Sequence, residues 1–307
     1  MPSKELLKQL QNMSLDDKIL KTKEKIWDFY THYEGKVYVS FSGGKDSTVL
    51  LHIARQVFPD IEAVFVDTGL EYPEIKDFVK TFTNVTIIRP DMSFAEVIKE
   101  HGWCYPNKKV AIIIYHSRNG KKLGLKYFNE PLANPIIHEG VKHYKHLLNA
   151  PFKISDKCCD IMKKKPFKKY QKQTGKHPII GTMAYESINR YRAWILTGCN
   201  AFNSREPKST PLSFWTSADI KQYILLNNLK ICSVYGSVVI DKKGKCQTTG
   251  EKRTGCIFCP IAMKQKINGK NRIQRLYDTH PKLYDYVLNK LNLKQLLDYE
   301  NIDYKVN

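Results

Sequence analysis

The sequence predicts an α/β fold built on a doubly wound parallel sheet. Short β-branched or aromatic runs alternate with segments whose apolar residues recur at helical spacing. From residue 36 to residue 89 the order is strand, helix, strand, helix, strand, which favours parallel strands joined by crossover helices. Two polar loops, 42–47 and 67–74, each follow a predicted strand. We therefore expect both at the carboxyl edge of the sheet, where ligands bind in open α/β folds.

The individual elements are predicted from periodicity, capping residues and turn residues. The predicted strands are short and rich in Val, Ile and aromatic residues, and they cover 36–42, 61–66, 85–89 and 178–183. The predicted helices are amphipathic and cover 4–30, 46–55, 74–82 and 215–226. A loop at 254–260 precedes a helical tail.

The composition is that of a folded globular protein, with 42% hydrophobic and 11% aromatic residues. The first thirty residues carry charges every few positions, and no run of eighteen uncharged apolar residues occurs. We therefore expect a cytoplasmic protein with no signal peptide and no membrane partner. In that reducing compartment, the eight cysteines are expected as ligands, reactive thiols or core residues, not as disulfides.

The chain is expected to contain three parts: an N-terminal helical segment (1–34), an α/β domain (35–230) and a small cysteine-containing region (231–307). Residues 101–175 are predicted to be a partly helical insertion in the second part. This stretch holds sixteen basic and four acidic residues, so it contributes +12 of the net charge of +20. Such an excess suits a polyanion such as DNA or RNA, and a solvated lysine-rich surface is the open alternative.

The segment Ser42-Gly-Gly-Lys-Asp-Ser47 is typical of a phosphate-binding loop. Glycines let backbone N–H groups approach phosphate oxygens, and the N-terminus of the following helix favours negative charge. Lys45 adds a positive charge, and Asp46 is best explained as a Mg²⁺ ligand. The spacing is not that of a Walker A loop.

This loop resembles the PP-loop of the ATP pyrophosphatase superfamily. Asp67-Thr-Gly69 with Glu71 and Pro73 resembles the second nucleotide loop of its adenylylsulfate branch, and the similarity covers about residues 35–260. Further matches are Gly181–Ser187 with Arg190, and Pro211–Asp219. That branch includes phosphoadenylylsulfate (PAPS) reductases, the ATP-binding subunit of sulfate adenylyltransferase, and the DndC-like proteins of DNA phosphorothioation.

The resemblance implies an adenine nucleotide alpha hydrolase-like fold of the HUP type that binds ATP with Mg²⁺. Asp67 and Gly69 would lie near the adenosine. Arg190 or Arg192 would neutralise the charge that develops as pyrophosphate leaves, so Lys45, Asp46 and Arg190 are the expected catalytic residues. The residues implied to hold the phosphates are Ser42, Gly43, Gly44, Lys45, Asp46 and Ser47. The alternatives are an ordinary turn at Asp67 and a surface ion pair between Glu186 and Arg190.

Cys158-Cys159 and Cys256-Ile-Phe-Cys259 form a candidate set of four thiolate ligands, which would select zinc or an iron-sulfur cluster. The arrangement resembles the 4Fe-4S site of assimilatory adenylylsulfate reductases, which implies a 4Fe-4S cluster. Zinc is the rival metal, and buried, redox-inert cysteines are the remaining alternative. The side chains expected to offset the thiolate charge are Lys157, Lys163 and Arg253.

The preferred function is an ATP-dependent adenylating enzyme that forms AMP and pyrophosphate, an ATP pyrophosphatase of the sulfurtransferase type. It would activate an acceptor such as nucleic acid, and a sulfur-donor protein would then displace AMP. The first alternative is a reductase that forms sulfite from a sulfonucleotide, although reductases of this kind carry a nucleophilic cysteine near the C-terminus and none follows Cys259 here. The second is a non-catalytic regulator that senses nucleotides and binds nucleic acid. The residues do not identify the acceptor, the sulfur donor or the oligomeric state.

Overall fold

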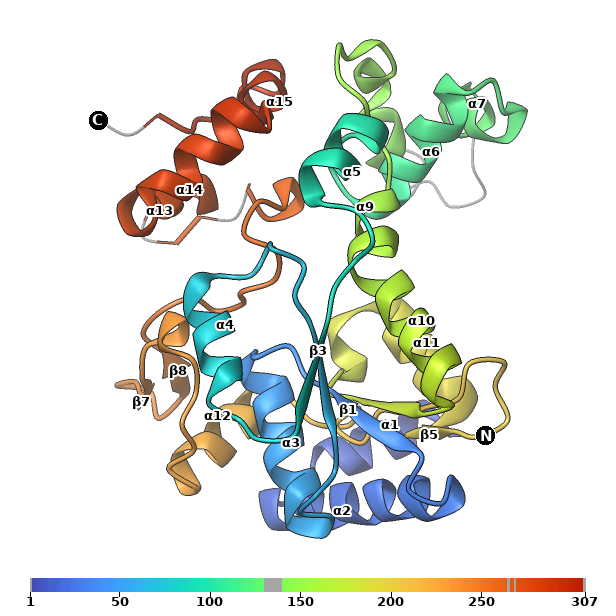
Figure 1. Cartoon of the computed structure of the whole chain (residues 1–307), viewed down its shortest axis with the longest axis vertical. Coiled ribbons are helices and arrows are strands. Elements are labelled where there is room, and N and C mark those ends of the chain that lie inside the picture. Colours follow the sequence, from blue (N-terminus) through green and yellow to red (C-terminus); the bar gives the residue numbers. More distant parts are fainter. Residues whose placement is uncertain (1, 130–139, 264–265, 268, 306–307) are drawn as a thin grey trace. The chain divides into compact units, whose positions relative to one another are not determined.

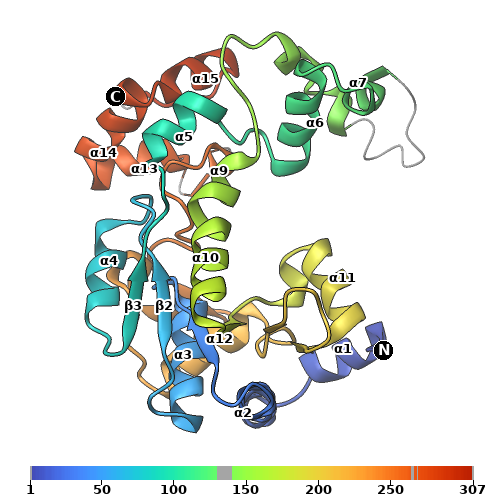
Figure 2. The ribbon, with the colours of Figure 1, turned by 45° about the vertical axis from the view of Figure 1, so that its right-hand side comes forward.

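The computed structural model describes residues 2–129, 140–263, 266–267 and 269–305, and the chain divides into two compact units. Figures 1 and 2 trace the chain through them. Unit 1 consists of Met1–Asp67, Glu71–Arg89 and Pro166–Gly255. Unit 2 consists of Thr68–Leu70, Pro90–Lys165 and Cys256–Asn307. These boundaries divide the sequence differently from the three expected parts, which stay a prediction.

A six-stranded, mostly parallel sheet forms the core of unit 1, so the predicted fold class is confirmed. Its order is β3-β2-β1-β4-β6-β5, and only β5 runs antiparallel to its neighbour. The strands are β1 (Val37–Ser40), β2 (Ala63–Val66), β3 (Val85–Ile88), β4 (His177–Ile180), β5 (Asn200–Ala201) and β6 (Lys208–Ser209). In the sheet, Val39 of β1 pairs with Ala63 of β2 on one side and with Ile179 of β4 on the other. The strand order reverses between β1 and β4, so the loop after β1 lies at the switch point where α/β sheets bind ligands.

Both faces of the central strands are buried, as a parallel sheet requires. Tyr38 of β1 and Val64 of β2 pack with Tyr170 of helix α10 (Lys165–Thr174). The neighbouring side chains Val39 and Ala63, which alternate to the opposite face, are also fully buried. The run of β-branched and aromatic residues that predicted these strands is therefore the run that forms the core.

The N-terminal segment forms two helices, where periodicity predicted one. These are α1 (Lys4–Gln11) and α2 (Leu15–His32). The Ser14 hydroxyl accepts a hydrogen bond from Asp17 N and starts the second helix. The predicted helix over 215–226 is confirmed as α12 (Ser217–Leu226), with a capping box formed by Thr216 and Asp219.

The other helices of unit 1 flank the sheet, and a β-hairpin that periodicity did not predict lies outside it. The helices are α3 (Lys45–Val57), α4 (Pro73–Lys80) and α11 (Ile188–Thr197), with 3-10 turns at Ala184–Glu186 and Ser233–Tyr235. The hairpin strands are β7 (Val238–Ile240) and β8 (Cys246–Thr248).

Unit 2 is helical and combines most of residues 101–175 with the C-terminal tail, while 166–175 belong to unit 1. The described residues of this stretch are partly helical, as expected, and 130–139 lie outside them. That the stretch is an insertion stays a prediction. The Glu300 carboxylate joins the two segments, because it accepts a hydrogen bond from Tyr105 Oη at 2.7 Å and lies 2.7 Å from His146 Nε2. The helices are α5 (Phe94–His101), α6 (Lys108–Arg118), α7 (Lys122–Asn129), α9 (Lys157–Cys159), α13 (Arg272–Thr279), α14 (Pro281–Asp285) and α15 (Leu293–Tyr299). Short 3-10 or π turns lie at Lys145–Asn149, Asp160–Lys164, Pro260–Ala262 and Tyr286–Lys290.

Across the described part of the chain, none of the helices has both the length and the apolar character that a bilayer crossing requires.

Candidate active site

The predicted phosphate loop, residues 42–47, forms a tight turn between β1 and α3 in unit 1. Gly43 has a φ of 66°, in the left-handed region. A Cβ atom at this position would lie 2.9 Å from Ile75 Cγ2 and 3.0 Å from Val79 Cγ2, both on α4. The loop therefore requires glycine here for conformation and for space.

Hydroxyl groups within the loop hold its shape. Ser42 Oγ and Ser47 Oγ are 3.0 Å apart, and Ser47 Oγ donates to Gly44 O at 2.9 Å. Thr48 Oγ1 donates to the same carbonyl at 3.0 Å. No side chain caps the N-terminus of α3 at Gly44. The amides of the first turn therefore have no side-chain cap, which suits the binding of an anion such as phosphate at this helix N-terminus.

Lys45 and Asp46 place opposite charges at the start of α3. The Lys45 side chain is only 7% exposed, and its Nζ lies 3.1 Å from Asp46 Oδ1. Despite this ion pair, the buried Oδ1 atom accepts no hydrogen bond of regular geometry from any described residue. A buried carboxylate oxygen with spare acceptor capacity at this turn suits a Mg²⁺ ligand, and the role predicted for Asp46 stays a prediction.

Tyr235 covers this loop, although no sequence pattern singled it out. The Lys45 Nζ atom lies 5.6 Å from the centre of the Tyr235 ring. The Tyr235 hydroxyl lies 3.0 Å from Thr254 Oγ1, and it would lie 3.3 Å from a Cβ atom added to Gly44. Burial raises the pKa of Tyr235 to about 12, so the phenol keeps its proton at neutral pH. Tyr235 therefore lies against the loop as a neutral side chain whose hydroxyl can form hydrogen bonds.

The Glu186 carboxylate binds two arginines. Its side chain is 8% exposed, forms an ion pair with Arg190, and accepts from Arg253 Nη2 at 2.7 Å. It also accepts from Met183 N at 3.2 Å. Burial lowers the pKa of Arg190, which the nearby charge of Asp46 opposes. The pair of Glu186 and Arg190 is therefore part of the loop's surroundings, with a nearly buried carboxylate.

The alternative arginine, Arg192, forms no ion pair with a described residue. This contrast favours Arg190 as the arginine beside the phosphate loop.

The second predicted loop carries a carboxylate that is already paired. Asp67 follows β2, and its oxygens lie 2.7 Å from Lys76 Nζ and 3.4 Å from Arg89 Nε. Gly69 has a φ of 74°, and an added Cβ would meet no atom within 4 Å. The roles of Asp67 and Gly69 near the adenosine stay predictions.

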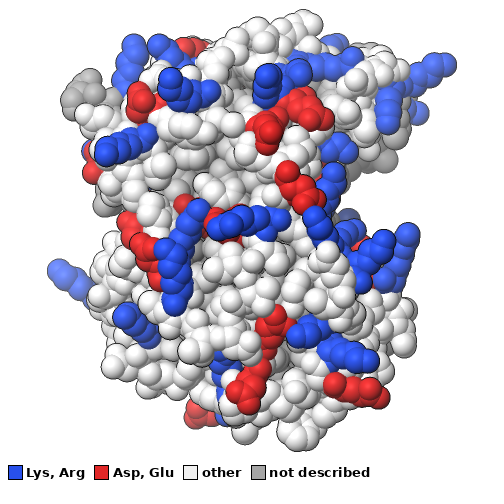
Figure 3. Space-filling view, viewed as in Figure 1, with Lys and Arg blue, Asp and Glu red and all other residues white. Residues whose placement is uncertain are grey.

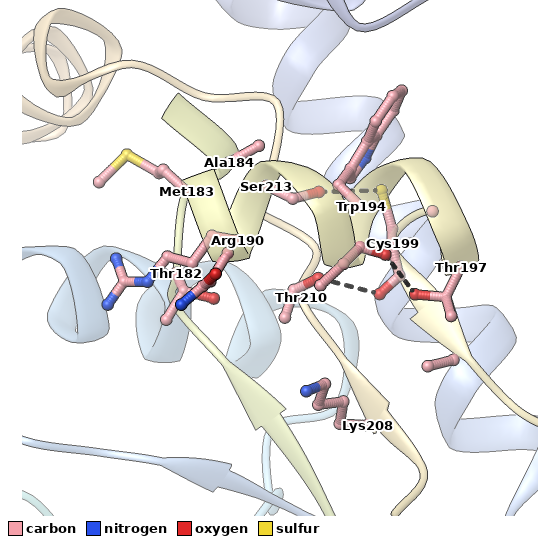
Figure 4. A pocket seen from close by; sticks show the side chains of 14 residues that line it. Thr182, Met183, Ala184, Arg190, Trp194, Thr197, Cys199, Lys208, Thr210 and Ser213 are labelled. Carbon is pink, nitrogen blue, oxygen red and sulfur yellow. Dashed lines mark hydrogen bonds between the residues drawn. The ribbon is translucent and has the colours of Figure 1, made fainter. Parts of the chain in front are cut away.

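A cavity of about 180 Å³ borders Arg190 within unit 1. Figure 4 shows Thr182, Met183 and Arg190 on one side and Cys199 on the other. The Cys199 thiol lies 3.3 Å from Ser213 Oγ, and burial raises its pKa. The cavity offers room for a small chemical group next to the predicted catalytic arginine.

All four predicted cysteine ligands belong to unit 2, and they are joined by a fifth cysteine. A hydrogen bond with Cys104, more than burial, raises the pKa of the Cys158 thiol to about 12. Cys158 also interacts with Cys159 and Cys256, and Cys259 interacts electrostatically with Cys256 and Cys159. The two pairs, far apart in sequence, therefore converge.

The cysteines lie near one another, but their side chains are not arranged as metal ligands. Among the described residues, no three His, Cys, Asp or Glu side chains surround a common point as metal ligands would. The donor set is chemically suited to a thiophilic metal, because it consists of soft sulfur atoms in one unit. The four-thiolate site stays a prediction.

The side chains expected to offset the thiolate charge have different contacts. Lys163 acts on Cys159, together with Lys108, and Arg272 acts on Cys259. Arg253, in unit 1, pairs with Glu186. The roles of Lys157 and Arg253 beside the thiols stay predictions.

Comparison with known proteins places these features in a family. A family model described as "Phosphoadenosine phosphosulfate reductase domain" matches residues 36–123 and 115–262. The chain belongs to this family. The match confirms the family resemblance inferred from the sequence, and both predicted nucleotide loops, Arg190 and the four predicted cysteine ligands lie within the matched residues.

Related proteins differ in length and description. An uncharacterized protein of Methanocaldococcus jannaschii is 26% identical over 272 residues, which cover 88% of this chain and 51% of that protein. Sulfate adenylyltransferase subunit 2 of Proteus mirabilis is 25% identical, covering 74% of this chain and 70% of that protein. The crystal structure of PAPS reductase from Candida auris, in complex with phosphate, has a TM-score of 0.42 at 17% identity, and the match covers 80% of this chain and 98% of that one. The chain spans about half the length of the archaeal relatives it matches, 51% and 41%.

Proposed function

We propose that this member of the PAPS reductase domain family binds Mg²⁺ and ATP at residues 42–47 and transfers AMP to an acceptor, with release of pyrophosphate. One observation carries the proposal. The turn combines an obligatory glycine, an uncapped helix N-terminus, a buried lysine and a buried carboxylate oxygen with spare acceptor capacity. Each of these matches a different part of a magnesium-bound polyphosphate.

The residues would act through position and charge. The acceptor oxygen attacks the α-phosphorus while the bond from that phosphorus to the bridging oxygen breaks, so pyrophosphate is the leaving group. The α3 amides and Lys45 hold the leaving group, and Arg190 compensates the charge that develops on it. Asp46 would hold Mg²⁺, which supplies further charge neutralisation when bound. No proton donor is needed for a pyrophosphate leaving group at neutral pH.

The proposed acceptor is a nucleic acid, in which the activated oxygen would be replaced by sulfur. The terminal sulfur of a persulfide on a sulfur-donor protein would attack the activated atom and displace AMP. A second thiol of the donor would then cleave the S–S bond, which leaves the sulfur on the acceptor and a disulfide on the donor. The support is the charge of residues 101–175 and the +20 of the chain. On the face in Figure 3, the described lysines and arginines are interspersed with acidic and uncharged residues.

We assign the metal chemistry to the cysteines of unit 2. Cys158, Cys159, Cys256 and Cys259 would hold a 4Fe-4S cluster, with zinc as the rival. When bound, such a cluster supplies a redox-active metal-sulfide centre. The protein's own contribution is a set of thiols kept close together by mutual hydrogen bonds and flanked by basic side chains.

The competing function is a sulfonucleotide reductase, which the name of the family model favours. It would release sulfite. Residues 260–307 contain no cysteine, so the attacking thiol would have to come from another cysteine of the chain or from a partner protein. A regulator without turnover would instead bind ATP or a sulfonucleotide and form neither pyrophosphate nor sulfite.

The deciding experiment measures pyrophosphate release from ATP and Mg²⁺ by anaerobically purified protein, with and without DNA or RNA. Sulfite release from adenylylsulfate and phosphoadenylylsulfate is measured in parallel. Lys45→Ala should lower pyrophosphate formation roughly 100-fold or more. Lys80→Ala, which removes an exposed lysine of α4, is the matched control and should keep full activity.

The products distinguish the proposed functions. Pyrophosphate release stimulated by a nucleic acid supports adenylation of that polymer, whereas sulfite without pyrophosphate replaces it with the reductase. Cys256→Ser should abolish iron content and visible absorbance while ATP binding remains. Unchanged metal content in this variant would contradict the four-thiolate site.

A further inference from the structure

We propose that Arg253 is a second phosphate-neutralising residue of the nucleotide site and that Glu186 is the positioning residue for Arg190 and Arg253. This inference rests on the proposed function, because it assigns both arginines to the polyphosphate of the bound nucleotide. All residues that carry it belong to unit 1.

The first step is the sharing of one carboxylate by two arginines. Arg190 comes from α11, whereas Arg253 lies 63 residues further along the chain, and both contact Glu186. One negative charge faces two positive charges, so the group keeps a surplus positive charge. Such a surplus next to a phosphate loop is electrostatically suited to an anionic ligand.

The second step is the position of this group beside the phosphate loop. A Cβ on Gly181, at the end of β4, would lie 3.2 Å from the carbonyl oxygen of Asp46. The segment with Glu186 follows directly. Arg190 interacts electrostatically with both Asp46 and Arg253, so its guanidinium lies within range of both charges.

The third step is the anchoring of the backbone that carries Arg253. The next residue, Thr254, pairs its hydroxyl with Tyr235 Oη at 3.0 Å. The Tyr235 ring faces Lys45, and its hydroxyl lies near Gly44. Arg253 therefore extends from a segment that is fixed against the phosphate loop, and its guanidinium is oriented in advance of binding.

The fourth step is the spare bonding capacity of Arg253. Among its donors, only Nη2 has a partner within the described part of the chain, and the side chain is 66% exposed. A guanidinium has five N–H donors in a planar fork that suits phosphate. Arg253 can thus bind a phosphate oxygen while Glu186 still holds its other edge.

The test measures binding by isothermal titration calorimetry with full-length protein. The probes are α,β-methylene-ATP with Mg²⁺, pyrophosphate with Mg²⁺, and adenosine. Arg253→Gln should weaken the two phosphate-containing probes by about tenfold or more and leave adenosine unchanged. Arg205→Gln removes an exposed arginine of the same unit and is the matched control, with affinities within about twofold of wild type.

Glu186→Gln separates positioning from simple charge neutralisation. If Glu186 orients the arginines, its loss weakens pyrophosphate binding although the site becomes more positive. Tighter pyrophosphate binding in this variant would overturn the positioning role. Circular dichroism and thermal melting verify that both variants are folded.

Failure of this inference is distinguishable from failure of the proposed function. If wild-type protein binds the probes and Arg253→Gln binds them equally well, only the role of Arg253 is overturned. If wild-type protein binds no phosphate-containing probe, both are overturned. An equal loss of adenosine and pyrophosphate affinity in Arg253→Gln would show a structural effect and would also overturn the role.

Discussion

Replacement of Gly43 by alanine tests the packing of the phosphate loop on α4. The substitution introduces a Cβ into a residue with a φ of 66°, and that atom would lie 2.9 Å from Ile75 and 3.0 Å from Val79. Both neighbours are buried side chains that cannot move freely. We expect a loss of stability and a loss of ATP binding together.

The magnitude has two parts. The left-handed backbone costs an L-residue about 1–2 kcal/mol. Overpacking a well-filled region by one methyl group adds about 1–3 kcal/mol. Gly43→Ala should therefore lower the free energy of unfolding by about 2–5 kcal/mol, less a few tenths to about 1 kcal/mol for the stiffer unfolded chain.

Gly175→Ala separates the two parts. Gly175 has a similar φ of 67°, but an added Cβ would meet nothing within 4 Å. The backbone strain and the stiffening of the unfolded chain are expected to cost the two variants about the same. The difference between their losses in free energy of unfolding therefore measures the steric contact at Gly43. Urea unfolding followed by circular dichroism gives both values. Equal losses for the two variants, within about 0.5 kcal/mol, would refute the packing of this loop against α4.

Two further predictions concern stability. Glu300→Ala should cost about 2–3 kcal/mol in urea unfolding, because it removes the charged carboxylate that accepts from the buried Tyr105 hydroxyl and lies 2.7 Å from His146 Nε2. The exposed carboxylate of Glu100 is the control, and a comparable loss in Glu100→Ala would contradict the special role of Glu300. Burial, with repulsion from Lys23, lowers the pKa of His52 below 6.5, so the unfolded chain binds the extra proton first. The contribution of His52 to the free energy of unfolding is therefore complete above about pH 6.5 and is lost as the pH falls through the pKa of the folded state. In His52→Gln, the free energy of unfolding should decrease less on acidification than in the wild type. An identical pH dependence in the two proteins would refute this role of His52.

Local patterns were enough to predict most of unit 1. The strands near Val39 and Ala63 were predicted because their β-branched runs suit a buried parallel sheet. The loop at 42–47 was predicted because glycines, a lysine and hydroxyl residues between a strand and the start of a helix are typical of a phosphate-binding loop. The break at Ser14 was missed, although Ser14 with Asp17 is a recognisable helix start. The strands at 200–201 and 208–209 are too short to show periodicity.

The sequence by itself determined the fold class, the family, and the identity of the loop residues, because these depend on backbone preference and side-chain chemistry over a few consecutive positions. The tertiary structure alone decided that Tyr235 covers Lys45, that Arg253 binds Glu186, and that Cys104 joins the predicted thiols. These contacts join residues about 50 to 190 positions apart along the chain. Their formation depends on which buried surfaces pack together, and no local pattern in the sequence encodes that choice.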